Sequence, residues 1–170
     1  NAEEFGLTET GKRQIEKAAE ELTKEGVDII FASPLRRTRE TAEIVAGSVG
    51  AEIILDERLR ETDFGIYSGR LTSELWAKYP EPITRIEGNE EDRLEGFRAM
   101  RGRLEAFLAD IPEEYRGKHV AIVSHGDPIE ILHGILLGET LEASVSGWSP
   151  KVGSWTKVKP NNESGITNQE

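Results

Sequence analysis

The sequence predicts an α/β fold, specifically a three-layer α/β/α sandwich built on a mainly parallel sheet. Two apolar runs, residues 27–32 and 120–123, each end abruptly in polar residues and lead into a segment with helical apolar spacing, which is typical of buried parallel strands feeding helices. The chain has 170 residues, enough for one compact core, and no interior stretch has the composition of a linker. We therefore expect a single domain over residues 1–159 and a flexible polar tail over residues 160–170.

The first third of the chain is predicted to alternate helices with strands. Apolar residues recur at helical spacing between Thr8 and Gly26, which indicates an amphipathic helix. After the strand at residues 27–32, Ser33 and Pro34 supply an N-cap and a first helical position for a helix that runs to about residue 46.

The later elements are predicted from the same signals of periodicity, proline and glycine. In order, we expect a short strand at residues 51–55, an irregular connection at 59–67, a short helix at 71–78, a long helix at 90–111, a helix at 128–137 and an edge strand at 154–158. Asp127 is expected to be the N-cap of the helix at 128–137, with Pro128 at its first position.

Composition excludes several classes of protein and partner. The formal net charge of −11 repels polyanions, which argues against a nucleic-acid partner. No apolar run approaches the roughly 20 residues of a membrane span, so we expect a cytoplasmic protein without a membrane partner. Cysteine is absent, which excludes disulfides and thiolate chemistry. Binding of a small anionic ligand is compatible with this net charge if arginines cluster locally.

Two strand-to-helix junctions carry the candidate site, residues 33–38 and 124–127. The carboxyl ends of parallel strands meet at one edge of a sheet, and ligands of open α/β sheets bind there, beside helix N-termini. Arg36 and Arg37 at the first junction can bind phosphate oxygens, and His125 stands at the second. Glu61, on the connection at 59–67, is a candidate proton donor to a leaving alkoxide.

The residues alone leave alternatives open. His125 could be an ordinary loop residue, and nothing in the spacing chooses between Arg36 and Arg37. His119 is expected to be solvated, and His133 to be a partly buried structural residue of the helix at 128–137. A metal site of His125, Asp127 and His133 is disfavoured because it lacks the one-face spacing of helix-borne ligands.

Four segments together resemble the histidine phosphatase superfamily, in its phosphoglycerate mutase-like branch. They are residues 7–14 (LTETGKRQ), 33–42 (SPLRRTRETA), 59–65 (LRETDFG) and 123–126 (VSHG), and the resemblance covers residues 7–137. It implies phosphoryl transfer without a metal or cofactor, through a phosphohistidine. Carried over by position, Arg37 is the phosphate-binding arginine, Glu61 the proton donor and His125 the second histidine, which holds phosphoryl oxygens as an imidazolium beside the N–H of Gly126.

The chain departs from the family pattern at the nucleophile. The Arg-His-Gly motif that carries the attacking histidine is absent from the sequence, and Asn1 matches the phosphate-loop asparagine that follows this motif. We therefore expect the nucleophile upstream of Asn1, with Asn1 as a phosphate ligand. A relative that binds phosphate without hydrolysing it is the alternative.

These observations favour a phosphatase acting on a small phosphorylated metabolite. Phosphoglycerate mutase is the alternative within the family, and it is disfavoured because residues 65–93 are shorter than the corresponding region of the mutases that the chain resembles. A metal-dependent hydrolase using His125 and Asp127 is a third possibility. The sequence leaves the oligomeric state, monomer or dimer, open.

Overall fold

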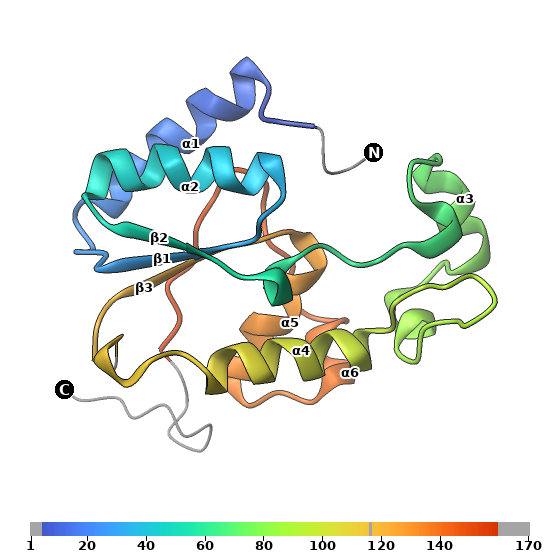
Figure 1. Cartoon of the computed structure of the whole chain (residues 1–170). Helices are drawn as coiled ribbons and strands as arrows, with labels where there is room; N and C mark the ends of the chain where they lie inside the picture. The colour runs from blue at the N-terminus through green and yellow to red at the C-terminus, as the bar shows by residue number, and fades with distance from the viewer. Residues whose placement is uncertain (1–4, 116, 160–170) are drawn as a thin grey trace.

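The computed structural model describes residues 5–115 and 117–159 and shows a three-stranded parallel sheet with helices on both faces (Figure 1). The strands are β1 (Ile29–Ala32), β2 (Glu52–Leu55) and β3 (Val120–Val123), in the order β2-β1-β3. Ile29 lies opposite Glu52 on one side and Val120 on the other, so the three strands are in register. The predicted parallel sheet is confirmed.

The helices form the two outer layers of the predicted sandwich. In Figure 1, α1 (Glu9–Leu22) and α2 (Arg36–Val49) lie above the sheet, while α4 (Phe97–Ala109), α5 (Gly126–Leu137) and α6 (Leu141–Ser144) lie below it. The short α3 (Thr72–Lys78) projects from the sandwich. Four single 3-10 turns complete the description: Glu57–Leu59, Gly65–Tyr67, Pro82–Arg85 and Glu113–Tyr115.

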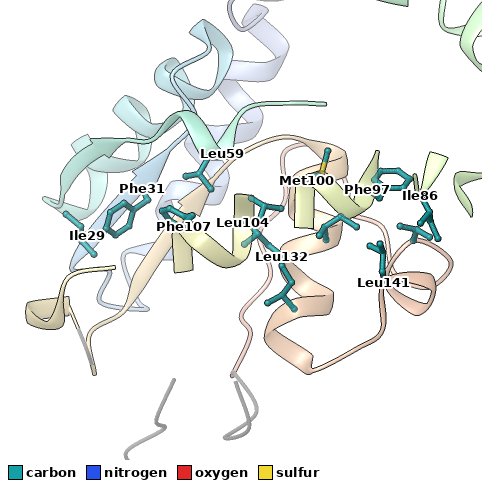
Figure 2. Close-up of a cluster of buried hydrophobic side chains, with 13 residues drawn as sticks. Ile29, Phe31, Leu59, Ile86, Phe97, Met100, Leu104, Phe107, Leu132 and Leu141 are labelled. Atoms are coloured by element: carbon teal, nitrogen blue, oxygen red, sulfur yellow. The ribbon is translucent and has the colours of Figure 1, made fainter. Parts of the chain in front are cut away.

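Alternation along β1 divides the core into two layers. Ile30 and Ala32 pack with α1 and α2, whereas Ile29 and Phe31 face α4 and α5. The second layer is the larger, and its side chains are drawn in Figure 2. Within it, the ring of Phe107 meets that of Phe31 edge-on, with centroids 5.4 Å apart. Burial of both faces of β1 fixes the position of its carboxyl end.

The long helix predicted over residues 90–111 begins later, at Phe97. A Cβ at Gly96 would clash with the backbone of Glu87 and Gly88, and Asn89 pairs with Leu94 as an isolated antiparallel bridge. The chain therefore turns back on itself here before the helix starts. This turn ends the segment of residues 65–95, which stands beside the carboxyl end of the sheet and is called the cap segment below.

Three further predictions are wrong in detail. Helix α2 is capped by Leu35 and not by Ser33, whose hydroxyl is used elsewhere. Helix α5 is capped by His125, so Asp127 lies within its first turn. Residues 154–158 form no strand. Trp155 donates to Glu21 of α1, and Lys157 donates to Glu25 in the turn that follows α1.

Across the part of the chain that the structure describes, no helix is both long and apolar enough to cross a membrane. The tail predicted at residues 160–170 lies outside the described residues, as does Asn1.

Candidate active site

The candidate site lies where β1 and β3 end. The two strands are paired, and the Ser33 amide extends the ladder by donating to the Val123 carbonyl at 2.9 Å. The junctions at residues 33–38 and 124–127 are therefore neighbours in space, as the parallel sheet predicts. The first turns of α2 and α5 begin at this edge with their amide groups facing it.

Arg37, Glu61 and His125 converge at this edge. Arg37 Nη2 lies 2.7 Å from His125 Nδ1 and 3.7 Å from Glu61 Oε2. Glu61 Oε2 lies 3.9 Å from the same histidine nitrogen. The structure thus brings together the three residues proposed from the motifs, although they come from three separate parts of the chain.

His125 is a neutral imidazole in this arrangement. A guanidinium offers only donors, so Nδ1 accepts from Arg37, and the ring proton is on Nε2, which donates to Ser33 Oγ at 2.8 Å. Burial, followed by the positive charges of Arg37, Arg103 and Arg60, lowers the pKa of His125 to about 3. The imidazolium that the resemblance implies therefore requires nearby negative charge that outweighs both burial and these positive charges.

Glu61 is held on a rigid connection. Leu59 is fully buried, and its carbonyl accepts from the Ser124 hydroxyl at 2.7 Å, which ties the connection to the end of β3. The amide of Thr62 donates to Glu61 Oε1 at 3.1 Å. Burial, followed by the charge of Asp127, raises the pKa of Glu61 to about 7. Such a carboxyl group can release or accept a proton at neutral pH.

Arginines make this edge locally positive within an acidic protein. Arg103, on α4, lies close enough to lower the pKa values of both His125 and Glu61, and it is itself held by Glu95 at 2.7 Å. The sequence analysis did not identify Arg103, because an arginine in the middle of an amphipathic helix gives no local signal of a functional role. The helix cap predicted at Ser33 is wrong for the same reason, since His125, which contacts the Ser33 hydroxyl, is 92 residues away in the sequence.

The other predicted residues fall in different places. Arg36 is directed to the exposed salt bridge with Glu40, 2.7 Å away, so the geometry separates it from Arg37. Gly126 is exposed at the first position of α5, with open space where a Cβ would stand. Asn1 lies outside the described residues.

The candidate metal ligands do not converge. Asp127 directs its carboxylate to Thr62 and Arg85, and His133 stacks on Trp148 with ring centroids 4.2 Å apart. Over residues 5–115 and 117–159, no group of three or more histidine, aspartate and glutamate side chains is placed to hold a metal ion.

A cavity of about 1440 Å³ opens beside the site. All four residues of β3 line it, together with apolar side chains of α1 and α5, and it reaches Arg37, Glu61 and His125. Among the described residues, β3 is paired only through β1, and its residues are partly exposed whereas those of β1 are buried. The cavity thus runs along the open edge of the sheet and ends at the polar cluster.

The family model of the histidine phosphatase superfamily (branch 1) matches residues 1–167. The chain belongs to this superfamily. The predicted resemblance is confirmed, and the α/β fold with its parallel sheet agrees with it. Among solved structures, a mycobacterial glucosyl-3-phosphoglycerate phosphatase in complex with VO3 has a TM-score of 0.73 and 26% identity, covering 84% of this chain and 74% of that one.

Two relatives are more similar to this chain in sequence. Phosphoserine phosphatase 1 of Hydrogenobacter thermophilus is 34% identical over 139 residues, covering 79% of this chain and 66% of the relative. A probable phosphoglycerate mutase GpmB of Enterobacter sp. is 35% identical over 141 residues, covering 78% and 63%. The chain thus spans slightly less than two thirds of the length of these relatives.

Proposed function

We propose that this chain forms the phosphate-binding and proton-donating part of a phosphatase that hydrolyses small phosphomonoesters through a phosphohistidine. The observation that carries the proposal is the convergence of Arg37, Glu61 and His125 within 4 Å at the carboxyl end of the sheet. Phosphoryl transfer needs preorganised positive charge around the phosphoryl oxygens and a proton for the leaving oxygen. These three side chains offer both.

Each side chain has one task in this reaction. Arg37 and the first-turn amides of α5, including that of Gly126, bind phosphoryl oxygens, and His125 joins them once the anion supplies the compensating charge. Protonated Glu61 gives its proton to the leaving alkoxide as the P–O bond breaks and the N–P bond forms. The resulting carboxylate then takes a proton from water, whose oxygen attacks phosphorus as the N–P bond breaks, which releases phosphate and the free histidine.

The attacking histidine is supplied, in this proposal, by residues that precede Asn1. The sequence contains three histidines. His119 is exposed and contacts the Glu25 carbonyl, and His133 stacks on Trp148, so each is engaged away from the cluster. The cavity along β3 leads to Arg37, Glu61 and His125, which offers a route for a group that approaches from outside the described residues.

A phosphatase is favoured over a mutase, although relatives of both kinds exist. The similarity to a phosphoserine phosphatase and to the VO3-bound phosphatase supports hydrolysis of a small phosphorylated metabolite, and the short stretch at residues 65–93 agrees with it. The similarity to a probable phosphoglycerate mutase keeps mutase activity as the second candidate. A substrate of this kind implies a cytoplasmic location.

The test is carried out on the full-length gene product. We expect release of phosphate from members of a phosphomonoester panel and an acid-labile phosphohistidine during turnover. His125→Ala should reduce turnover roughly 10²- to 10³-fold through loss of phosphoryl stabilisation, with a much smaller effect on the unfolding midpoint.

Other outcomes would decide between the alternatives. Interconversion of 2- and 3-phosphoglycerate without net hydrolysis would establish the mutase. Binding of phosphate with no turnover and no phosphohistidine would overturn the enzyme and leave a phosphate-binding relative. The codons before Asn1 provide a simpler check, since the phosphatase requires that they encode Arg-His-Gly.

A further inference from the structure

A continuous series of polar contacts joins Glu61 to the cap segment. The Thr62 amide donates to Glu61, while the Thr62 hydroxyl donates to Asp127 Oδ2 at 2.7 Å. On the other side of the same carboxylate oxygen, Arg85 Nη1 donates at 2.9 Å. One oxygen of Asp127 therefore links the loop that bears Glu61 to Arg85 of the cap segment.

Arg85 is an unusual anchor because its charge is buried. Only 4% of the residue is exposed, and its guanidinium carbon lies 4.5 Å from the centroid of the Phe97 ring and 5.3 Å from that of Trp76. A buried guanidinium requires a counter-charge, and Asp127 provides it at one end. The pair thereby fixes the Asp127 carboxylate in one position, against the Thr62 hydroxyl.

We propose that Asp127, held by Arg85, is a positioning residue of the reaction, which orients Glu61 through Thr62 and whose negative charge favours the protonated form of Glu61. This inference rests on the proposed function, since it assigns the group that prepares the proton donor. It gives Asp127 a role other than helix capping. It also means that the cap segment, through Arg85, helps to position the proton donor.

The other charged groups around Glu61 act in the opposite direction. Arg37 of α2 and Arg103 of α4 both lower the pKa of Glu61, and His125, with its pKa lowered to about 3, is neutral at neutral pH. Burial raises the pKa of Glu61 most, and Asp127 raises it next. Removing the Asp127 charge should therefore leave the two arginines to favour the ionised carboxylate.

The test is Asp127→Asn in the full-length protein. The amide keeps an oxygen that can accept from Thr62 and Arg85 but removes the charge. We expect the titration midpoint of the Glu61 carboxyl carbon, followed by NMR, to move from about 7 toward the ordinary value of 4.5. The basic limb of the kcat/KM profile should move to lower pH by the same amount. Glu87→Gln, which removes an exposed carboxylate of the cap segment paired with Arg98, is the matched control and should move neither.

A second variant covers the case in which Asp127→Asn fails to fold because Arg85 is left buried without a counter-charge. In Asp127→Asn/Arg85→Met both charges are removed together, and the Glu61 midpoint should again decrease. An unchanged midpoint in a folded variant would overturn the inference. A wild-type protein without phosphatase or mutase activity would instead overturn the proposed function, and the NMR titration distinguishes this failure from the first.

Discussion

Replacing Glu61 by glutamine should stabilise the protein increasingly as the pH rises. Burial and the charge of Asp127 raise the pKa of this carboxyl from 4.5 to about 7. The folded protein therefore binds the proton more tightly than the unfolded chain does. The resulting stabilisation is complete below the unfolded pKa of 4.5 and is lost as the pH rises through about 7. Since one pKa unit corresponds to about 1.4 kcal/mol, the total loss is about 3 kcal/mol.

Urea denaturation of the wild type and of Glu61→Gln measures this loss directly. Glutamine keeps the size of the side chain but does not titrate, so its free energy of unfolding lacks this contribution. The difference between the two proteins should grow by about 2.5 kcal/mol, in favour of the variant, from about pH 5 to about pH 8.

Glu87→Gln is the control for this comparison. The Glu87 carboxylate is exposed, and Arg98 lowers its pKa, so it is ionised in the folded protein at both pH values. Its difference from the wild type should therefore change little between them. A Glu61→Gln difference that also stays constant would refute the argument that Glu61 is held in a desolvated, proton-retaining environment.

Three further perturbations test other parts of the structure. Arg37→Ala should weaken binding of inorganic phosphate roughly 10- to 100-fold by calorimetry, since a charged hydrogen bond is lost, and Arg37→Lys should recover only part of it. Phosphate binding should be accompanied by proton uptake at His125. In a Glu61→Gln background, this uptake should make the binding enthalpy depend on the ionisation enthalpy of the buffer. Adding His125→Asn should abolish the dependence on buffer. Gly96→Ala should lower the free energy of unfolding by more than about 1 kcal/mol, because the added Cβ would clash with backbone atoms. Gly102→Ala, in open space on α4, should raise the free energy of unfolding by about 0.5–1 kcal/mol. Equal effects of the two substitutions would argue against the tight turn at Gly96.

Local signals in the sequence were sufficient for most of the sandwich. Thr8 caps α1 with its side chain, and the apolar run at residues 120–123 forms β3, because hydrogen bonding of a cap and burial of a strand are decided by neighbouring residues. The start of α4 could not be predicted in this way. The spacing of Leu94 from Phe97 is compatible with a helix, but the bridge between Asn89 and Leu94 and the close approach of Gly96 to the 87–88 backbone exclude it.

The candidate site was predictable as a set of motifs but not as a geometry. The motif resemblance selects Arg37, but spacing and residue chemistry alone could not choose between Arg36 and Arg37, because the choice depends on where α2 begins and on which side chain then faces His125. Arg85 and Asp127 are 42 residues apart and are joined only by tertiary packing. Such long-range electrostatic partners leave no periodic or capping signal in the chain.

The unusual pKa values of Glu61 and His125 are best understood together. The two side chains lie 3.9 Å apart, yet both have pKa values shifted toward the neutral form. At Glu61, burial and the charge of Asp127 outweigh the nearby arginines and give a pKa of about 7. At His125, burial and the arginines act in the same direction and give a pKa of about 3. A phosphate dianion bound beside Arg37 would raise both values, because negative charge favours protonation of every neighbouring group. In the proposed reaction, Glu61 would then retain the proton that it donates, and His125 would gain a positive charge to stabilise the phosphoryl oxygens. Binding of the phosphate group would thus create the protonation states that the proposed reaction uses.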